Sequence, residues 1–346
     1  MPFVAALLPV AIYIFVVYSL DSFSLVSVKS LVLLVLHGMV CALACFGLFH
    51  LTGLFLTEGA SNYLNPVMEE AVKAIPLLYL ARNKKTVFFI DSVICGAAVG
   101  GGFSILENVF YLVLGEPLGM GTILFRGLEV ALIHMGCSAI ISVALMFAVR
   151  LTERIKSRLA VKASDTIMAI FLFIVSPAMH ILHNSLDSGQ PLKQFIIVFG
   201  TMAVLLIWIY QYDGDMIHRW LDRGLDKQVS LLMSIKDGQL GDTKTGKYLM
   251  SVKENFPQDV FFDVICYVQL YVELSVAAKS RFMMREAGMD MPIDDSDKKL
   301  YLSQYTEFKS LEKSLGKTAR MTVAPIVKFY PADRKSLGDL LDECRK

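Results

Sequence analysis

Long apolar stretches alternate with short polar ones along the first 212 residues of the chain. A helix needs about 20 apolar residues to cross the hydrocarbon core of a bilayer. By that measure seven segments are candidate spans: residues 3–20, 31–56, 63–81, 87–115, 120–149, 164–187 and 193–212. The pattern predicts an all-α protein with a polytopic bundle of about seven transmembrane helices. The third segment contains charged residues, and if it only re-entered the membrane the number of spans would fall by one.

The pattern changes near Tyr212. Residues 213–346 contain most of the charged residues, together with turn-forming stretches such as KDGQLGDTKTGK at 236–247. In residues 256–288, apolar side chains recur at helical spacing among charged ones, which predicts an amphipathic helix packed on a partner rather than another span. We therefore predict a transmembrane domain over 1–212 and a cytoplasmic, mainly helical tail over 213–346.

The overall composition agrees with a membrane protein. Hydrophobic residues make up 55% of the chain and charged ones 19%, with a mean hydropathy of +0.55, whereas an ordinary soluble chain is roughly half apolar and a quarter charged. A net charge of +1 gives no reason to expect a nucleic-acid partner. The six cysteines lie mostly in apolar stretches without CxxC spacing, so we expect small buried residues rather than disulfides.

Basic loops predict the orientation in the cell membrane. Lys and Arg close to a spanning segment resist translocation, which places the loops at 81–86 and 150–162 in the cytoplasm. A multi-pass protein with seven spans then has its N-terminus outside and its C-terminus inside.

Glu69, Glu70 and Lys73 lie inside the third apolar segment. Charged groups at membrane depth are costly and persist mainly where they pair or line a functional cavity. Helical spacing brings Lys73 next to either glutamate, but adjacent side chains diverge by about 100°, so one glutamate faces a cavity while the other is held structurally. Just upstream, Asn65 and Pro66 predict a helix start, with Asn as the cap.

Three further polar motifs lie in later apolar segments. They are Phe103, Glu107 and Asn108 behind the glycines at 96, 100, 101 and 102; Arg126 with His134; and His180 with Asn184. The glycines permit close helix contact in a membrane. A single intramembrane histidine often serves only an interhelical hydrogen bond, as we expect of His37 and His50. Four motifs that contain titratable groups predict instead one shared functional site.

The ordered motifs EExxK, FxxxEN, Arg with His, and HxxxN resemble the PrsW family of intramembrane proteases over about residues 60–190. They are distantly similar to the CAAX prenyl-endopeptidases, which carry EExxxR, FxxxH and HxxxN. Glu107 stands where that second family has a histidine, and Lys73 is one residue closer than its arginine. A membrane-protein substrate in the lipid bilayer is therefore expected rather than a prenylated one. The resemblance loosely implies that this substrate is a regulator similar to an anti-sigma factor.

The resemblance also implies which residues form the site. We expect Glu69, Glu70, Glu107, His134, His180 and Asn184 to be catalytic, and Lys73, Asn108 and Arg126 to support them. Glu69 aligns with the first glutamate of the motif, which assigns it as the base that activates water. His180 and Asn184, one turn apart, are expected to donate N–H groups to the oxyanion.

On this interpretation no cofactor is required, since the HExxH signature of metalloproteases is missing. Zinc is the alternative, with His134 and His180 and either Glu69 or Glu107 as ligands. Two other functions stay open. One is a proton-coupled transporter or channel that uses the buried Glu, His and Lys as a relay, although the sequence shows no inverted repeat. The other is a non-catalytic protein that binds a membrane partner.

Overall fold

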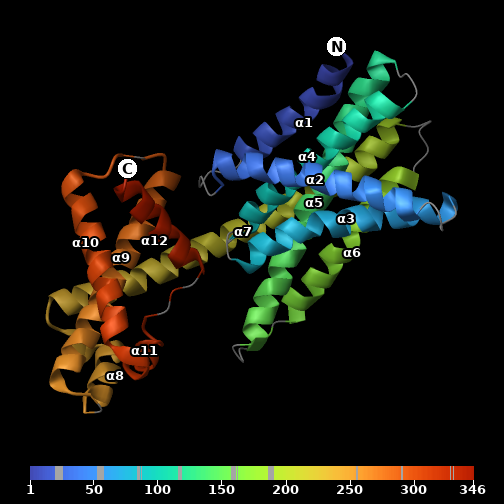
Figure 1. Cartoon of the computed structure of the whole chain (residues 1–346). Coiled ribbons are helices and arrows are strands. Elements are labelled where there is room, and N and C mark those ends of the chain that lie inside the picture. The colour runs from blue at the N-terminus through green and yellow to red at the C-terminus, as the bar shows by residue number, and fades with distance from the viewer. Residues whose placement is uncertain are drawn as a thin grey trace. The chain divides into compact units, whose positions relative to one another are not determined.

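The computed structural model covers the whole chain, and it divides into two compact units, Met1–Asp213 and Gly214–Lys346 (Figure 1). Within the described residues the secondary structure is helical, with no strand. These residues are 1–19, 26–52, 58–83, 86, 88–115, 119–156, 161, 163–185, 191–254, 256–289, 291–327, 329 and 331–346. The all-α fold with a helical bundle agrees with the prediction.

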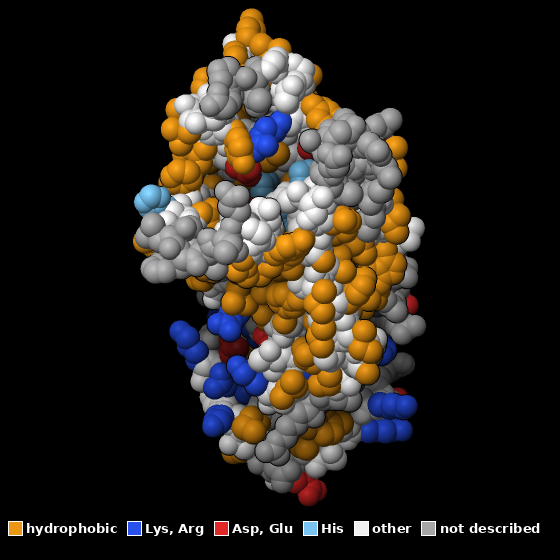
Figure 2. All heavy atoms as spheres, turned by 90° about the vertical axis from the view of Figure 1, so that its right-hand side faces the viewer, with side chains coloured by type: hydrophobic (Ala, Val, Ile, Leu, Met, Phe, Trp, Pro, Cys, Tyr) orange, Lys and Arg blue, Asp and Glu red, His pale blue; other side chains and the backbone are white. Residues whose placement is uncertain are grey.

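A central pair of helices organises the first unit. It consists of α4 (Phe89–Leu114) and α5 (Met120–Lys156), which are the most buried of its apolar helices. Around them pack α1 (Pro2–Ser19), α2 (Val28–Thr52), α3 (Glu58–Arg82) and α6 (Ala163–Ser185). The outer helices expose apolar side chains, as helices in contact with lipid do, and Figure 2 shows hydrophobic side chains over much of one face.

Five of the seven predicted spans coincide with helices that are long and apolar enough to cross a membrane, namely α1, α2, α4, α5 and α6. This criterion, applied to the described residues, does not select α3, which carries the charged motif, or α7 (Pro191–Lys236). Helix α7 is 46 residues long and continues without interruption from the last predicted span into the second unit. A sixth helix that meets the criterion, α9, belongs to that second unit.

Helix α3 begins at Glu58, so the predicted start at Asn65 and Pro66 is wrong. Pro66 lies inside the helix, where it forgoes one backbone hydrogen bond. Membrane helices tolerate such a proline because neighbouring groups can satisfy the freed carbonyl. The longer helix places Asn62 and Asn65 on the same element as Glu69.

Glycines allow α4 to contact its neighbours closely. A Cβ atom at Gly96 or Gly100 would overlap the backbone of α5, at Ser138 and His134 respectively, and one at Gly102 would overlap the backbone of α2. The predicted close helix approach is confirmed. It brings the backbone of His134 directly against α4.

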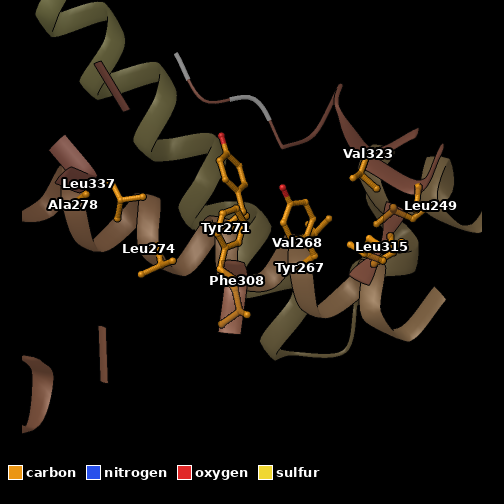
Figure 3. Close-up of a cluster of buried hydrophobic side chains, with 14 of the residues drawn as sticks. Leu249, Tyr267, Val268, Tyr271, Leu274, Ala278, Phe308, Leu315, Val323 and Leu337 are labelled. Carbon is orange, nitrogen blue, oxygen red and sulfur yellow. The ribbon is translucent and has the colours of Figure 1, made fainter. Parts of the chain in front are cut away.

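The second unit is built around α9 (Gln258–Glu286). The other elements are the end of α7, a short 3-10 helix (Leu240–Asp242), α8 (Lys244–Lys253), α10 (Asp295–Ser314), α11 (Gly316–Val323) and α12 (Pro331–Cys344). Val268, Val272 and Leu274 of α9 are fully buried, and the rings of Tyr267 and Phe308 stack with centroids 4.7 Å apart (Figure 3).

Helix α9 is apolar enough to be a candidate span, but its buried side chains pack on helices of its own unit. The buried Lys279 of α9 forms an ion pair with Asp333, with Nζ and Oδ1 3.1 Å apart. These contacts agree with the predicted amphipathic helix packed on a partner, and the partner is the rest of the unit.

Candidate active site

A cavity of about 590 Å³ lies among α2, α3, α4, α5 and α6. Residues from all four polar motifs line it: Glu69, Phe103, Glu107, Arg126, His134, His180 and Asn184. In the view of Figure 2, acidic, basic and histidine side chains gather in a hollow, with hydrophobic side chains close by. The structure therefore brings together motifs that are far apart in the sequence.

Glu69 and Glu70 face different surroundings, as their helical spacing predicts. Glu70 is 1% exposed and accepts a hydrogen bond from the fully buried Lys73 at 2.6 Å. Glu69 lines the cavity, and its Oε2 atom is buried without a hydrogen-bond partner in the described part of the chain. Glu69 is thus the glutamate available for chemistry, and Glu70 is the one held by a structural ion pair.

His180 lies between the two glutamates. Its Nδ1 atom is 3.0 Å from Oε1 of Glu70, and its Nε2 atom is 3.6 Å from Oε2 of Glu69. A carboxylate can only accept, so we assign the ring proton to Nδ1, which donates to Glu70. The lone pair of Nε2 is then directed toward Glu69.

His134 has a corresponding arrangement from the other side. Its Nε2 atom is 2.5 Å from Oε2 of Glu107, and its Nδ1 atom is 3.0 Å from Nζ of Lys73 and 3.9 Å from Oε2 of Glu69. An ammonium group can only donate, so Nδ1 accepts and Nε2 carries the proton that is donated to Glu107. The guanidinium of Arg126 holds the other oxygen of Glu107 at 3.2 Å.

Glu69, His134 and His180 could hold a metal ion. Each offers one ligand atom, and these atoms all lie within 4.8 Å of one another. Two imidazole nitrogens and a carboxylate oxygen are a ligand set that zinc accepts. Each histidine also donates its other N–H to a carboxylate, the arrangement that fixes metal-binding histidines in their working tautomer. Because Lys73 uses the same lone pair of His134, a bound metal would replace that one contact and leave Lys73 with Glu70.

The other two predicted residues have separate places. Asn108 is buried and donates to the backbone oxygen of Ala6 in α1 at 3.5 Å, so it supports helix packing and does not line the cavity. Asn184 lines the cavity, with its Oδ1 atom 3.1 Å from Nδ1 of His183. His180 and Asn184 are both expected from the sequence to donate to the oxyanion. Because both nitrogens of His180 face glutamates, only the Asn184 amide is available for that hydrogen bond.

The structure also places in the cavity wall residues that the motifs do not contain. They are Ala42, Cys45, Phe46 and Phe49 of α2, Ser61, Asn62 and Asn65 of α3, Phe110 and Tyr111 of α4, and His183 of α6. The asparagines could have been found in the sequence, because their spacing from Glu69 puts them on one helical face. The aromatic residues give no such signal, since they resemble lipid-facing residues.

Comparison with protein families matches residues 24–210, more than half of the chain, to the family described as PrsW family intramembrane metalloprotease. The chain belongs to the PrsW family. The match spans α2 to α6, and with them every residue of the polar motifs. No curated protein and no solved structure matches the chain.

Membership of the PrsW family supports a membrane-embedded, multi-pass peptidase that acts on membrane proteins. It favours this function over the transporter and the non-catalytic alternatives. The family's description as a metalloprotease, together with the Glu69, His134 and His180 group, also favours the zinc alternative over a metal-free mechanism.

Proposed function

We propose that this PrsW-family protein hydrolyses a peptide bond of a membrane-protein substrate in the cavity, at a zinc site formed by Glu69, His134 and His180. One observation carries the proposal. These three side chains, from three different helices, bring one ligand atom each to within 4.8 Å of one another in the lining of the cavity. In addition, the ring nitrogen of each histidine that would not bind the metal contacts a carboxylate, as is usual for histidines in metal sites.

Hydrolysis needs an activated water, stabilisation of the oxyanion and proton transfer. Zinc bound there supplies Lewis-acid activation of water and of the scissile carbonyl. Glu69 has two carboxylate oxygens: one would hold the metal, and the other would accept a proton from the attacking water and pass it to the nitrogen of the leaving amine as the C–N bond breaks. The Asn184 amide, which lines the same cavity, donates a hydrogen bond to the developing oxyanion. If the reaction needs no metal, Glu69 remains the base.

The remaining charged residues position this set. Glu70 fixes the His180 ring, and Lys73 neutralises Glu70. Glu107 fixes the His134 ring, and Arg126 neutralises Glu107. Each histidine thus has a carboxylate partner that is itself paired with a cation. The lone pair of His180 is directed toward Glu69, whereas that of His134 accepts from Lys73 and would turn to a metal only when one is bound.

We further propose that the cavity opens toward the outer side of the cell membrane. With the N-terminus outside and the C-terminus in the cytoplasm, the connections before α3 and after α4 lie outside. Asn62 near the start of α3 and Gly115 just after α4 both line the cavity. A membrane protein with an extracytoplasmic segment, such as an anti-sigma-factor-like regulator, could then reach the site.

The test is cleavage by the purified protein in lipid nanodiscs, with candidate membrane substrates and mass spectrometry of the products. Glu69→Gln, His134→Ala and His180→Ala should abolish cleavage, whereas His37→Ala and His50→Ala, outside the cavity, should cleave like wild type. Active wild type should contain one zinc per chain, lose activity to a chelator and regain it with Zn²⁺. Full activity of zinc-free protein would show that the reaction needs no metal, with Glu69 as the base. Full activity of Glu69→Gln would overturn both the zinc mechanism and the metal-free one.

A further inference from the structure

An aromatic wall lines part of the cavity that holds the proposed catalytic residues. On α2, the lining residues recur at helical spacing and so share one face: Ala42, Cys45, Phe46 and Phe49. Phe110 of α4 continues this wall, with its ring centroid 4.9 Å from that of Phe46. Aromatic rings that line a cavity offer large apolar contact area to whatever enters it.

The wall includes two small side chains, which leave more room than the neighbouring rings do. Ala42 and Cys45 are buried and line the cavity beside the larger rings. Phe103 packs with Ala42 and Cys45, and its ring centroid is 4.8 Å from that of His134. The apolar part of the cavity therefore adjoins the histidines directly, so a side chain that fills it lies close to the reacting bond.

Another part of the cavity lining is polar. Asn62, Asn65 and Glu69 follow one another along one face of α3, and all three line the cavity. Within the described residues neither asparagine amide makes a hydrogen bond. At about 1.5 Å per helical residue, Asn62 and Glu69 are roughly 10 Å apart along the helix. An extended peptide, which advances about 3.3 Å per residue, would pass three residues over this distance.

We infer that the cavity binds its substrate as an extended segment and selects a bulky apolar side chain, such as Leu or Phe, next to the scissile bond. The side chain enters the aromatic recess formed by Ala42, Cys45, Phe46, Phe49 and Phe110. The amides of Asn62 and Asn65 pair with the substrate backbone. This inference rests on the proposed peptidase function and adds its substrate preference.

The asparagines favour an extended segment over a helical one. A helix satisfies its own backbone hydrogen bonds, so it would leave the two amides without partners. An unwound segment at membrane depth has free N–H and C=O groups, and each costs several kcal/mol unless it is paired. The volume of about 590 Å³ also suits a short peptide segment better than a whole helix about 10 Å wide.

The test uses substrates that differ only at the residue beside the cleaved bond, with Gly, Ala, Leu or Phe there. Wild type should cleave the Leu and Phe substrates about 10- to 100-fold faster in kcat/KM than the Ala substrate. Ala42→Leu fills the recess and should reduce that ratio at least about tenfold. Ala44→Leu, on the exposed face of the same helix, should keep the wild-type ratio. An unchanged ratio in Ala42→Leu would overturn the inference.

A second arm measures binding without turnover. Glu69→Gln protein is irradiated with a substrate peptide that carries a benzophenone side chain at the same position. The crosslinks should map to Phe46, Phe49 or Phe110, and Asn62→Leu with Asn65→Leu should weaken crosslinking about tenfold or more. Crosslinks confined to other helices would reject the recess. If wild type cleaves no substrate at all, the proposed function fails, while these crosslinks still decide the place of binding.

Discussion

Nδ1 of His180 lies 3.0 Å from Oε1 of Glu70, so a carboxylate outside the cavity fixes a histidine that lines it. Glu70 is in turn held by Lys73 at 2.6 Å. Two adjacent glutamates can therefore serve the same reaction by different routes. Glu69 acts at the cavity, and Glu70 acts through His180.

Removing the charge of Glu70 should weaken the metal site. Glu70→Gln keeps the shape of the side chain but loses the carboxylate that orients His180, which should lower zinc affinity by roughly 10–100-fold. Competition with a chromophoric chelator measures this affinity directly. His50→Ala, whose residue lies outside the cavity, serves as the control and should bind zinc like wild type. A Glu70→Gln protein with unchanged zinc affinity would contradict the positioning role.

Removing Lys73 should destabilise the protein. Lys73→Met leaves the buried Glu70 charge without its cation, which typically costs about 3–5 kcal/mol. The double variant Glu70→Gln with Lys73→Met should recover much of this loss of stability while still binding zinc less tightly than wild type. Thermal unfolding in detergent provides the measurement. For comparison, Lys309→Met breaks an exposed pair with Glu312, which should cost no more than about 1 kcal/mol. Equal effects of the two lysine variants would argue against a buried ion pair.

Asn184 should act on turnover rather than on binding. If its amide donates to the oxyanion, Asn184→Ala should reduce kcat by roughly 10²–10³ with little change in KM. The neighbouring Ser185 donates to the backbone oxygen of Ile181 of its own helix and is not among the residues that line the cavity, so Ser185→Ala should behave like wild type. A variant with raised KM and normal kcat would instead make Asn184 a substrate-binding residue.

The site could be predicted from the sequence because charged and polar residues stand out in apolar segments. Helical spacing predicted that only one of Glu69 and Glu70 faces the cavity, since neighbouring side chains cannot face one point, and the resemblance to the family motif pointed to Glu69. The glycines before Phe103 predicted a close helix contact, and the structure identifies α5 and α2 as the partners of α4. What each histidine nitrogen contacts depends on residues from other helices, so the spacing of His180 and Asn184 could not show that His180 faces two glutamates.

Two features lay beyond the sequence for physical reasons. Asn65 and Pro66 have the residue types of a helix start, but membrane helices also accept an internal proline, and α3 begins at Glu58. Phe46 and Phe110 are apolar residues on apolar helices. Whether such a ring faces lipid or a cavity is decided by the neighbouring helices, and hydropathy is the same in both cases.

Gly100 should be sensitive to a single added methyl group. Gly100→Ala places a Cβ where the backbone of His134 lies, and overpacking of this kind typically costs about 1–3 kcal/mol. Because the displaced residue is His134, zinc affinity and activity should fall along with the melting temperature. The matched control is Gly47→Ala in α2, where a Cβ meets nothing within 4 Å. Its effect should be neutral, or stabilising by up to about 1 kcal/mol through helix propensity. A tolerated Gly100→Ala would contradict the close α4–α5 contact.

The orientation in the membrane can be read from the cysteines that the chain already has. Cys266 in α9 is exposed, whereas the other five cysteines are buried. If the C-terminus is cytoplasmic, as the basic loops indicate, a membrane-impermeant maleimide should label the protein in inverted vesicles and not in intact cells. Cys266→Ser should abolish that labelling.

A cysteine introduced on the other side of the membrane tests the same topology from outside the cell. Gly119, an exposed residue just before α5, lies on the outer side of the cell membrane in the proposed topology. In the Cys266→Ser background, Gly119→Cys should therefore be labelled in intact cells, on the same side as the cavity opening. Labelling of wild type from outside would reverse the topology, and with it the proposal that the substrate enters from the extracytoplasmic side. Labelling of both cysteines from the same side would instead require an even number of spans between Gly119 and Cys266, so that α5, α6 and α7 could not all cross the membrane.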